Sequence, residues 1–187
     1  MNRWKLVVSA ATLAAIALGA LLTLLYLRGN STTVVFVVRH GEKATSFCNT
    51  DIPDNVELSE EGITRAAELA HVMKDARVGA VYASNYCRTQ RTVQDAADNV
   101  GVPVISEPNL DNLIEQIWRD HPGQRILIAG HQTTVPLIIE KLGGEPIPTI
   151  EDPEFDNLYM VIIARMAYNS RTTVVRLKYG APPEATE

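Results

Sequence analysis

Short apolar runs alternate with segments of helical periodicity, and this alternation constrains the fold more than any other feature of the chain. The runs are residues 34–38, 80–83, 102–105 and 125–129, and each is bounded by polar or glycine-containing turns. Such runs are typical of strands covered on both faces. The helical segments are residues 59–73, 84–100, 111–120 and 133–142. Strands and helices in strict alternation imply right-handed crossovers and a mostly parallel sheet.

Two further strands are expected near the carboxyl terminus, at residues 158–166 and 172–179. A short turn at 168–170 joins them, so they should form an antiparallel hairpin. The predicted fold is therefore α/β: a three-layer α/β/α sandwich with a mostly parallel central sheet and a C-terminal antiparallel hairpin. We expect this domain to occupy residues 33–180 and to be followed by a flexible tail at 181–187.

The amino-terminal segment differs from the rest of the chain. Residues 6–27 carry no charge, and as a helix they would reach about 33 Å, which spans a bilayer. A cleaved secretory signal is the alternative, although its apolar region is usually shorter. We predict a transmembrane anchor or uncleaved signal at 1–28 and a short linker at 29–32. Arg3 and Lys5 outweigh Arg28, which favours a periplasmic or extracellular body close to the membrane.

Composition excludes several classes of protein. The formal net charge is −5, and the three basic residues before residue 29 leave the body still more acidic. An acidic domain has no electrostatic basis for binding nucleic acid. With 46% hydrophobic residues and two cysteines in 187, the chain is neither disordered nor a small disulfide scaffold.

Basic side chains follow several of the predicted strands, at the edge where α/β sheets bind their ligands. Arg39 and His40 follow the first strand. Arg88 lies in the first turn of the predicted helix at 84–100, and His131 follows the fourth strand. Two guanidinium groups around two imidazoles suit a phosphoryl group, because arginine pairs with phosphate oxygens. The arginine charges would also keep a histidine neutral and nucleophilic. Attack by that histidine on phosphorus would form a phosphohistidine.

A zinc site is the alternative chemistry for paired histidines. The chain contains neither an H-E-x-x-H nor a C-x-x-C motif, and both histidines have an arginine nearby. We therefore expect neither a metal nor a cofactor.

Four motifs resemble those of the histidine phosphatase superfamily, the phosphoglycerate mutase-like proteins, over about residues 33–166. They are Val38-Arg39-His40-Gly41-Glu42, Leu58-Ser59-Glu60-Glu61-Gly62, Ser84-Asn85-Tyr86-Cys87-Arg88 with Thr92, and Gly130-His131. The resemblance implies a phosphatase in which His40 is the phosphorylated nucleophile. It also implies that Arg39, Arg88 and His131 bind the phosphoryl group. Gly41 and Lys43 are further candidates for contact with the substrate.

The general acid departs from the family pattern. Many mutase-like members have a glutamate in an L-x-E pattern, and Asn112 stands at the place of that glutamate here. The acid phosphatases have an aspartate directly after the second histidine, and Gln132 stands at the place of that aspartate. Asp111 and Glu115 are the nearest candidates, but a helix cap and a solvated side chain explain them equally well. A missing acid favours good leaving groups such as phosphohistidine. The chain has no sign of the long insertions of a glycolytic mutase, so we favour a hydrolase.

Cys48 and Cys87 should both lie near the pocket. In an extracytoplasmic body they could form a disulfide, and two unpaired thiols are the alternative.

These observations favour a membrane-anchored, metal-independent phosphatase that acts on a phosphomonoester or similar compound through a phosphohistidine. A short tether would suit a small-molecule, lipid or envelope-glycan substrate, as in the lipopolysaccharide-modifying phosphatases that the chain resembles. A phosphohistidine or phosphoprotein phosphatase with a cytoplasmic body is the second hypothesis. A catalytically silent phosphoryl-binding domain is the third. The sequence leaves the oligomeric state open.

Overall fold

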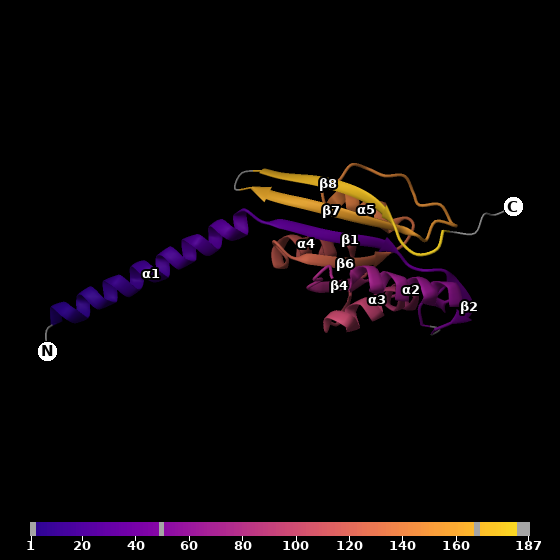
Figure 1. Cartoon of the computed structure of the whole chain (residues 1–187), viewed down its shortest axis with the longest axis horizontal. Coiled ribbons are helices and arrows are strands. Elements are labelled where there is room, and N and C mark those ends of the chain that lie inside the picture. Colours follow the sequence, from indigo (N-terminus) through magenta and orange to yellow (C-terminus); the bar gives the residue numbers. More distant parts are fainter. Residues whose placement is uncertain (1–2, 49–50, 167–168, 183–187) are drawn as a thin grey trace.

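A six-stranded sheet in the order β5-β4-β6-β1-β7-β8 forms the centre of the molecule (Figure 1). The computed structural model of the protein describes residues 3–48, 51–166 and 169–182, without the side chains of 3–11, 27 and 28. The strands are β1 (Thr32–Arg39), β4 (Ala80–Ala83), β5 (Val104–Ser106), β6 (Arg125–Gly130), β7 (Asn157–Met166) and β8 (Asn169–Lys178).

The pairing of the strands agrees with the prediction. Strand β1 pairs in parallel with β6, β6 with β4, and β4 with β5. Strand β7 is antiparallel to β1, and β8 is antiparallel to β7. The mostly parallel sheet with a C-terminal antiparallel hairpin is therefore confirmed.

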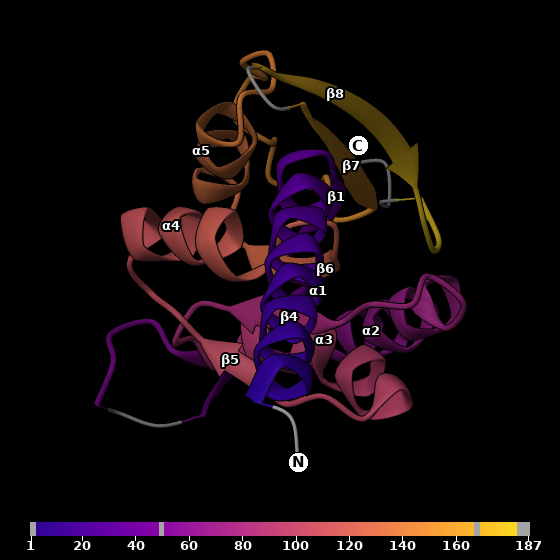
Figure 2. The ribbon, with the colours of Figure 1, turned by 90° about the vertical axis from the view of Figure 1, so that its left-hand side faces the viewer.

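Helices cover both faces of the sheet (Figure 2). Helices α2 (Glu60–Met73) and α3 (Cys87–Val100) pack on one face, and α4 (Leu110–Asp120) and α5 (Thr134–Lys141) pack on the other. Alternate side chains of a strand point to opposite faces. Accordingly, Val35 and Val37 belong to the apolar cluster under α4 and α5, whereas Phe36 and Val38 belong to the cluster under α2 and α3. The three-layer architecture is confirmed.

A small antiparallel pair, β2 (Lys43–Phe47) and β3 (Val56–Leu58), lies outside the main sheet, where the sequence indicated only a polar loop. Val56 and Leu58 are buried, so an apolar contact fixes the pair to the domain. In Figure 1 this pair lies at the end of the sheet opposite to the amino terminus. It therefore flanks the carboxyl ends of the parallel strands, where ligands bind in this class of fold.

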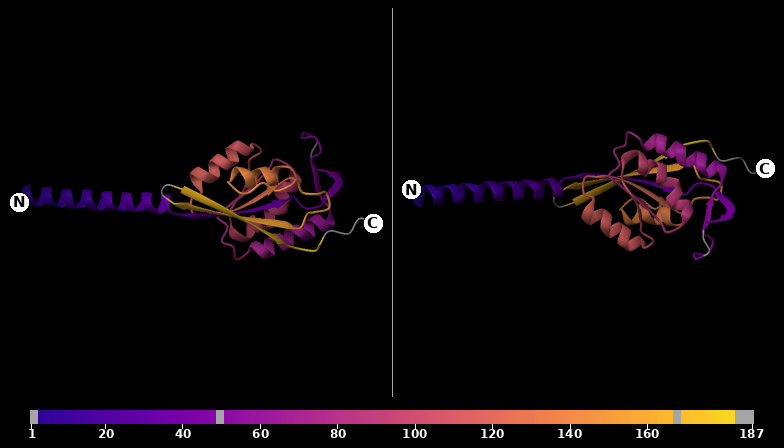
Figure 3. Two further views of the ribbon diagram at one scale, coloured as in Figure 1. Left: turned by 90° about the horizontal axis from the view of Figure 1, so that it is seen from above. Right: turned by 90° about the horizontal axis from the view of Figure 1, so that it is seen from below.

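Helix α1 (Arg3–Gly29) extends away from the domain (Figures 1 and 3). All side chains described on it, from residue 12 to 26, are exposed, including Leu21 and Leu25. Among the described residues, no helix is both long and apolar enough to cross a membrane.

Several predicted boundaries at the two ends of the chain differ from the structure or lie beyond it. The predicted span at 6–27 falls partly outside the described side chains. The linker is shorter than the predicted 29–32, because only Asn30 and Ser31 separate α1 from β1. Of the predicted tail, 183–187 lie outside the described residues, as do 167 and 168 of the hairpin turn.

Candidate active site

A polar cleft of about 270 Å³ lies at the carboxyl edge of the sheet. His40 reaches it from the end of β1, Arg88 from the first turn of α3, and His131 from the end of β6. The structure thus brings together three of the four residues expected to handle the phosphoryl group. The cleft is lined by His40, Lys43, Asp54, Tyr86, Arg88, His131, Gln132 and Thr133.

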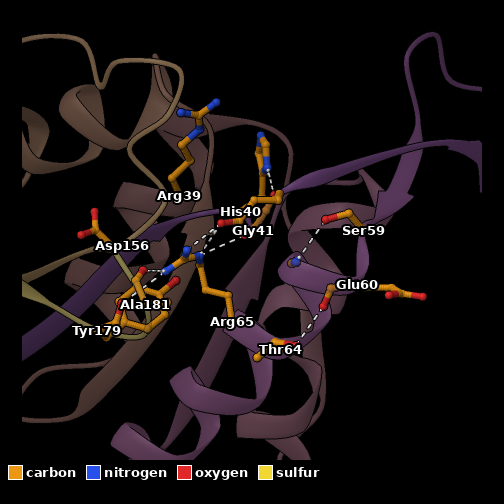
Figure 4. Close-up of polar contacts among 12 residues, drawn as sticks. Arg39, His40, Gly41, Ser59, Glu60, Thr64, Arg65, Asp156, Tyr179 and Ala181 are labelled. Atoms are coloured by element: carbon orange, nitrogen blue, oxygen red, sulfur yellow. Dashed lines mark hydrogen bonds and ion pairs between the residues drawn. The ribbon is translucent and has the colours of Figure 1, made fainter. Parts of the chain in front are cut away.

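One ring nitrogen of His40 is engaged by the backbone. Nδ1 lies 2.7 Å from the carbonyl oxygen of Gly41, as Figure 4 shows. A carbonyl can only accept a hydrogen bond, so in the neutral ring Nδ1 carries the proton and Nε2 keeps its lone pair. Burial lowers the pKa of His40 to about 3, opposed by the Gly41 hydrogen bond and assisted by the charges of His131, Arg88 and Arg39. Near neutral pH the imidazole is therefore neutral, and the lone pair of its Nε2 is available for nucleophilic attack.

His131 forms the other wall of the cleft. Its ring centroid lies 5.3 Å from that of His40, and its Nε2 lies 3.0 Å from the Ser84 hydroxyl oxygen. Burial and the charges of Arg88 and Arg39 lower the pKa of His131 to about 4. A neutral imidazole so placed can offer one N–H group to a phosphoryl oxygen.

Arg88 is buried and incompletely paired. Its Nη1 donates to the backbone carbonyl of Asp54 at 2.5 Å, and its plane lies over the Tyr86 ring, 4.3 Å from the centroid. Its Nε is buried and has no hydrogen-bond partner among the residues that the structure describes. An unsatisfied buried donor is costly, so this N–H group is available to an acceptor that enters the cleft.

Arg39 is buried and does not line the cleft, so its predicted contact with the phosphoryl group stays a prediction. Its Nη1 donates to the carbonyl oxygens of Glu151 and Asp152, and its Nη2 donates to the side chains of Gln132 and Asp152, all at 2.8 Å. These four contacts occupy all four N–H bonds of the terminal nitrogens. Only Nε is buried without a partner. Arg39 mainly anchors the segment at residues 151–152 beside the histidines.

Gly41 and Lys43 have different surroundings. Gly41 is buried, its N–H group donates to Thr92 Oγ1 at 2.9 Å, and a Cβ atom there would lie 3.0 Å from the carbonyl oxygen of Gly62. Gly41 therefore permits the close approach of α2 and makes no side-chain contact in the cleft. Lys43 is exposed and lines the cleft.

A buried ion pair fixes the backbone that follows the nucleophile. Arg65 on α2 donates to the carboxylate of Glu42 through Nε at 2.9 Å and through Nη2 at 2.6 Å. Arg65 Nη1 also donates to the carbonyl oxygens of Tyr179 and Ala181, as Figure 4 shows. One guanidinium group thus joins the His40 loop, α2 and the end of the chain.

The histidine phosphatase superfamily model (branch 1) matches residues 35–113, which include Arg39, His40 and Arg88. His131 lies beyond this match, and the fold places it in the same cleft. Residues 35–113 of the chain, which carry three of the four expected site residues, are therefore similar to the histidine phosphatase superfamily.

Solved structures with a similar fold include two phosphatases and a phosphoglycerate mutase. The protein histidine phosphatase SixA complexed with tungstate has 16% identity and a TM-score of 0.56, with 78% of this chain and 96% of that chain covered. The mycobacterial glucosyl-3-phosphoglycerate phosphatase with inorganic phosphate has 13% identity and a TM-score of 0.58, with 76% and 95% covered. Phosphoglycerate mutase from Bacillus anthracis has 13% identity and a TM-score of 0.56, with 79% and 94% covered. No match to a curated protein was found.

The two acids suggested by the sequence, Asp111 and Glu115, do not line the cleft. Asp111 is exposed and pairs with Lys141 at 2.8 Å, and Glu115 is exposed and pairs with Arg119 at 3.4 Å. Helix α4 turns its apolar residues toward the sheet, so positions 111 and 115 face solvent. Neither residue can act as the general acid from there, and this expectation is corrected.

Cys48 and Cys87 form a disulfide with a Cα–Cα distance of 6.3 Å. Their sulfur atoms lie near a carboxylate oxygen of Glu57, but sulfurs bonded to each other are not thiolate ligands for a metal. Cys87 is the first residue of α3, directly before Arg88. In the chain-entropy model, closing a loop of this length stabilises the fold by about 4 kcal/mol.

Sequence reasoning missed two residues beside the histidines. Asp54 lines the cleft, and the Phe155 ring lies 6.0 Å from His40 and 4.0 Å from the Arg39 guanidinium carbon. Both lie in irregular segments, outside the sequence motifs that contain the two histidines. No periodicity or motif marks such positions, so only the tertiary structure reveals them.

Proposed function

We propose that the chain is a metal-independent phosphatase that hydrolyses a phosphomonoester, or a similar phosphoryl compound, through a phosphohistidine on His40. The observation that carries this proposal is the pairing of His40, in which Nδ1 is bound to Gly41 and Nε2 is left for attack. The unpaired Nε–H groups of Arg39 and Arg88 support it, because buried guanidinium donors without acceptors suit an anion.

The reaction has two displacements. His40 Nε2 attacks phosphorus, the bond from phosphorus to the leaving oxygen breaks, and a phosphohistidine forms. Water then attacks phosphorus, the phosphorus–nitrogen bond breaks, and phosphate leaves with His40 neutral again. Arg88, His131 and Lys43 stabilise the oxygens of the transferring group as negative charge spreads over them. Arg39 contributes through its Nε and its charge.

The substrate should be a small phosphorylated molecule or an envelope glycan rather than a lipid headgroup. Strand β1 runs directly away from α1, and His40 follows its far end. The eight residues of β1 span about 27 Å, so the cleft would lie about that far from a membrane that surrounds α1. A lipid headgroup at the membrane surface would not reach it. Two structural neighbours, a protein histidine phosphatase and a glucosyl-3-phosphoglycerate phosphatase, suggest two substrate classes to try first.

The test uses the full chain in detergent with p-nitrophenyl phosphate, whose leaving group needs little acid assistance. We expect phosphate release that is unaffected by chelators, and an acid-labile phosphoenzyme after rapid quenching. Phosphate binding without turnover would instead indicate a catalytically silent phosphoryl-binding domain. Turnover that a chelator abolishes would contradict the metal-independent mechanism.

The proposal includes a location: α1 anchors the domain in a membrane, with the body outside the cytoplasm. Exposed apolar side chains along α1 support the anchor, since a helix of this kind has no stable place in water. The disulfide supports an oxidising compartment.

We expect the full chain to stay in the membrane fraction after an alkaline carbonate wash. Leu21→Glu with Leu22→Glu should release it, because each charge costs about 3 kcal/mol near the centre of a span. Ile63→Glu with Val72→Glu, at exposed positions on α2, is the matched control and should leave the chain in the membrane. A wild-type chain recovered as soluble protein would contradict the anchor.

A further inference from the structure

The cleft contains a carboxylate that neither the sequence motifs nor the proposed reaction has used. Of the described residues that line it, Asp54 alone carries a carboxyl group. Asp54 shares the cleft with both histidines and with Arg88, and its charge acts on His131, where it opposes the lowering of the pKa. A proton held on Asp54 is therefore within the space that a substrate must occupy.

The backbone of Asp54 is fixed on two sides. Its carbonyl oxygen accepts from Arg88 Nη1 and from the N–H group of Val56. The next residue, Asn55, accepts from the N–H group of Cys87 through its side chain and from that of Cys48 through its carbonyl. The disulfide joins the same two cysteines. The loop therefore presents Asp54 at a defined position beside α3.

The side chain of Asp54 is held much less tightly than its backbone. Its Oδ2 lies 3.6 Å from Arg88 Nη2, beyond hydrogen-bond distance, and 66% of the side chain is exposed. The residue has φ of 55°, in the left-handed region where aspartate and asparagine are the non-glycine residues found most readily. The carboxyl group can thus turn toward a bound substrate while the loop stays in place.

A bound phosphoryl group changes the electrostatics of Asp54. It competes for the Arg88 guanidinium and brings negative charge next to the carboxylate. Like charges this close favour a proton shared between them, so the occupied cleft stabilises the protonated carboxyl group.

We propose that Asp54 is the proton donor to the leaving group and so takes the role of the family glutamate, whose place in this sequence is held by Asn112. The inference rests on the proposed phosphatase function. As His40 Nε2 bonds to phosphorus and the bond to the leaving oxygen breaks, the Asp54 proton moves to that oxygen, and the alcohol departs. The Asp54 carboxylate then takes a proton from the water that attacks the phosphohistidine. Phosphate leaves, and both residues return to their starting states.

Asp54→Asn tests this role with little risk to the fold. Asparagine has the same shape, tolerates positive φ and leaves both backbone hydrogen bonds of residue 54 intact. The probes are p-nitrophenyl phosphate, a good leaving group, and phenyl phosphate, a poor one. The readout is kcat/KM, which ends at departure of the leaving group. We expect a loss of at least about 100-fold on phenyl phosphate and of less than about 3-fold on p-nitrophenyl phosphate.

Asp51→Asn is the matched control, since Asp51 is exposed in the same loop and does not line the cleft. It should change neither value. An equal loss on both substrates in Asp54→Asn would overturn the inference and make Asp54 a positioning residue for Arg88. An undiminished rate on phenyl phosphate would also overturn it. A wild type that is inactive on both substrates would overturn the proposed function itself and this inference with it.

Discussion

His40→Ala should abolish turnover of p-nitrophenyl phosphate and eliminate the trapped phosphoenzyme in the same variant. The structure gives the reason: His40 is the one described imidazole in the cleft whose Nδ1 is bound to a backbone carbonyl. Without Nε2 there is no atom to receive the phosphoryl group. We expect a fall in kcat of at least about 10⁴-fold, the range for removing a nucleophile. Single-turnover quenching and steady-state rates measure the two effects separately.

Controls distinguish loss of the nucleophile from loss of the fold. His40 is buried between His131 and Phe155, so alanine leaves a space there. His40→Asn fills more of it and can still donate to the Gly41 carbonyl. Both variants should keep the circular dichroism spectrum and bind inorganic phosphate. His71→Ala, at an exposed position on α2, should behave as wild type. A phosphoenzyme that persists in His40→Ala would transfer the nucleophilic role to another residue.

The main sheet could be predicted because its strands are covered on both faces. Runs such as residues 125–129 must then be apolar throughout, and this pattern is visible without tertiary information. The end of α3 could be predicted as well, since Gly101 adopts φ of 71° at the helix terminus. The strand pair β2 and β3 could not be predicted from the sequence. Its residues are mixed in character, and only contact with α3 and the buried Val56 stabilises them as strands.

The convergence of the two histidines of the cleft could be predicted for a topological reason. His40 and His131 follow adjacent parallel strands, β1 and β6, so their convergence depends only on strand order and direction. The different surroundings of Arg39 and Arg88 could not be predicted, because they depend on hydrogen bonds to residues far away in the sequence. Arg39 is bound by residues 151–152, more than a hundred positions away. The place of Asp54 in the cleft could not be predicted from sequence either. It depends on the hydrogen bond from Arg88 and on the disulfide to the first turn of α3.

Arg88→Lys should lower kcat/KM for p-nitrophenyl phosphate by about 10²-fold, although the positive charge is retained. Arg88 lines the cleft, its Nε–H group is buried without a partner among the described residues, and lysine has no counterpart to that group. Lysine also cannot form two parallel hydrogen bonds to phosphoryl oxygens. If charge alone mattered, the variant would remain close to wild type. The affinity for inorganic phosphate, measured by calorimetry, should fall in parallel with kcat/KM.

Arg91→Lys is the matched control for this variant. Arg91 lies three residues after Arg88 on α3. Its side chain is largely exposed, and its Nε lies 3.8 Å from a carboxylate oxygen of Glu57, too far for a hydrogen bond. The same substitution there should change neither kcat/KM nor phosphate affinity. Arg39→Lys is not a suitable comparison, because it would leave the carbonyl oxygens of Glu151 and Asp152 without their donor. If Arg88→Lys binds phosphate as wild type does, the guanidinium donor in the cleft is not what recognises the phosphoryl group, and Lys43 and His131 must supply that recognition.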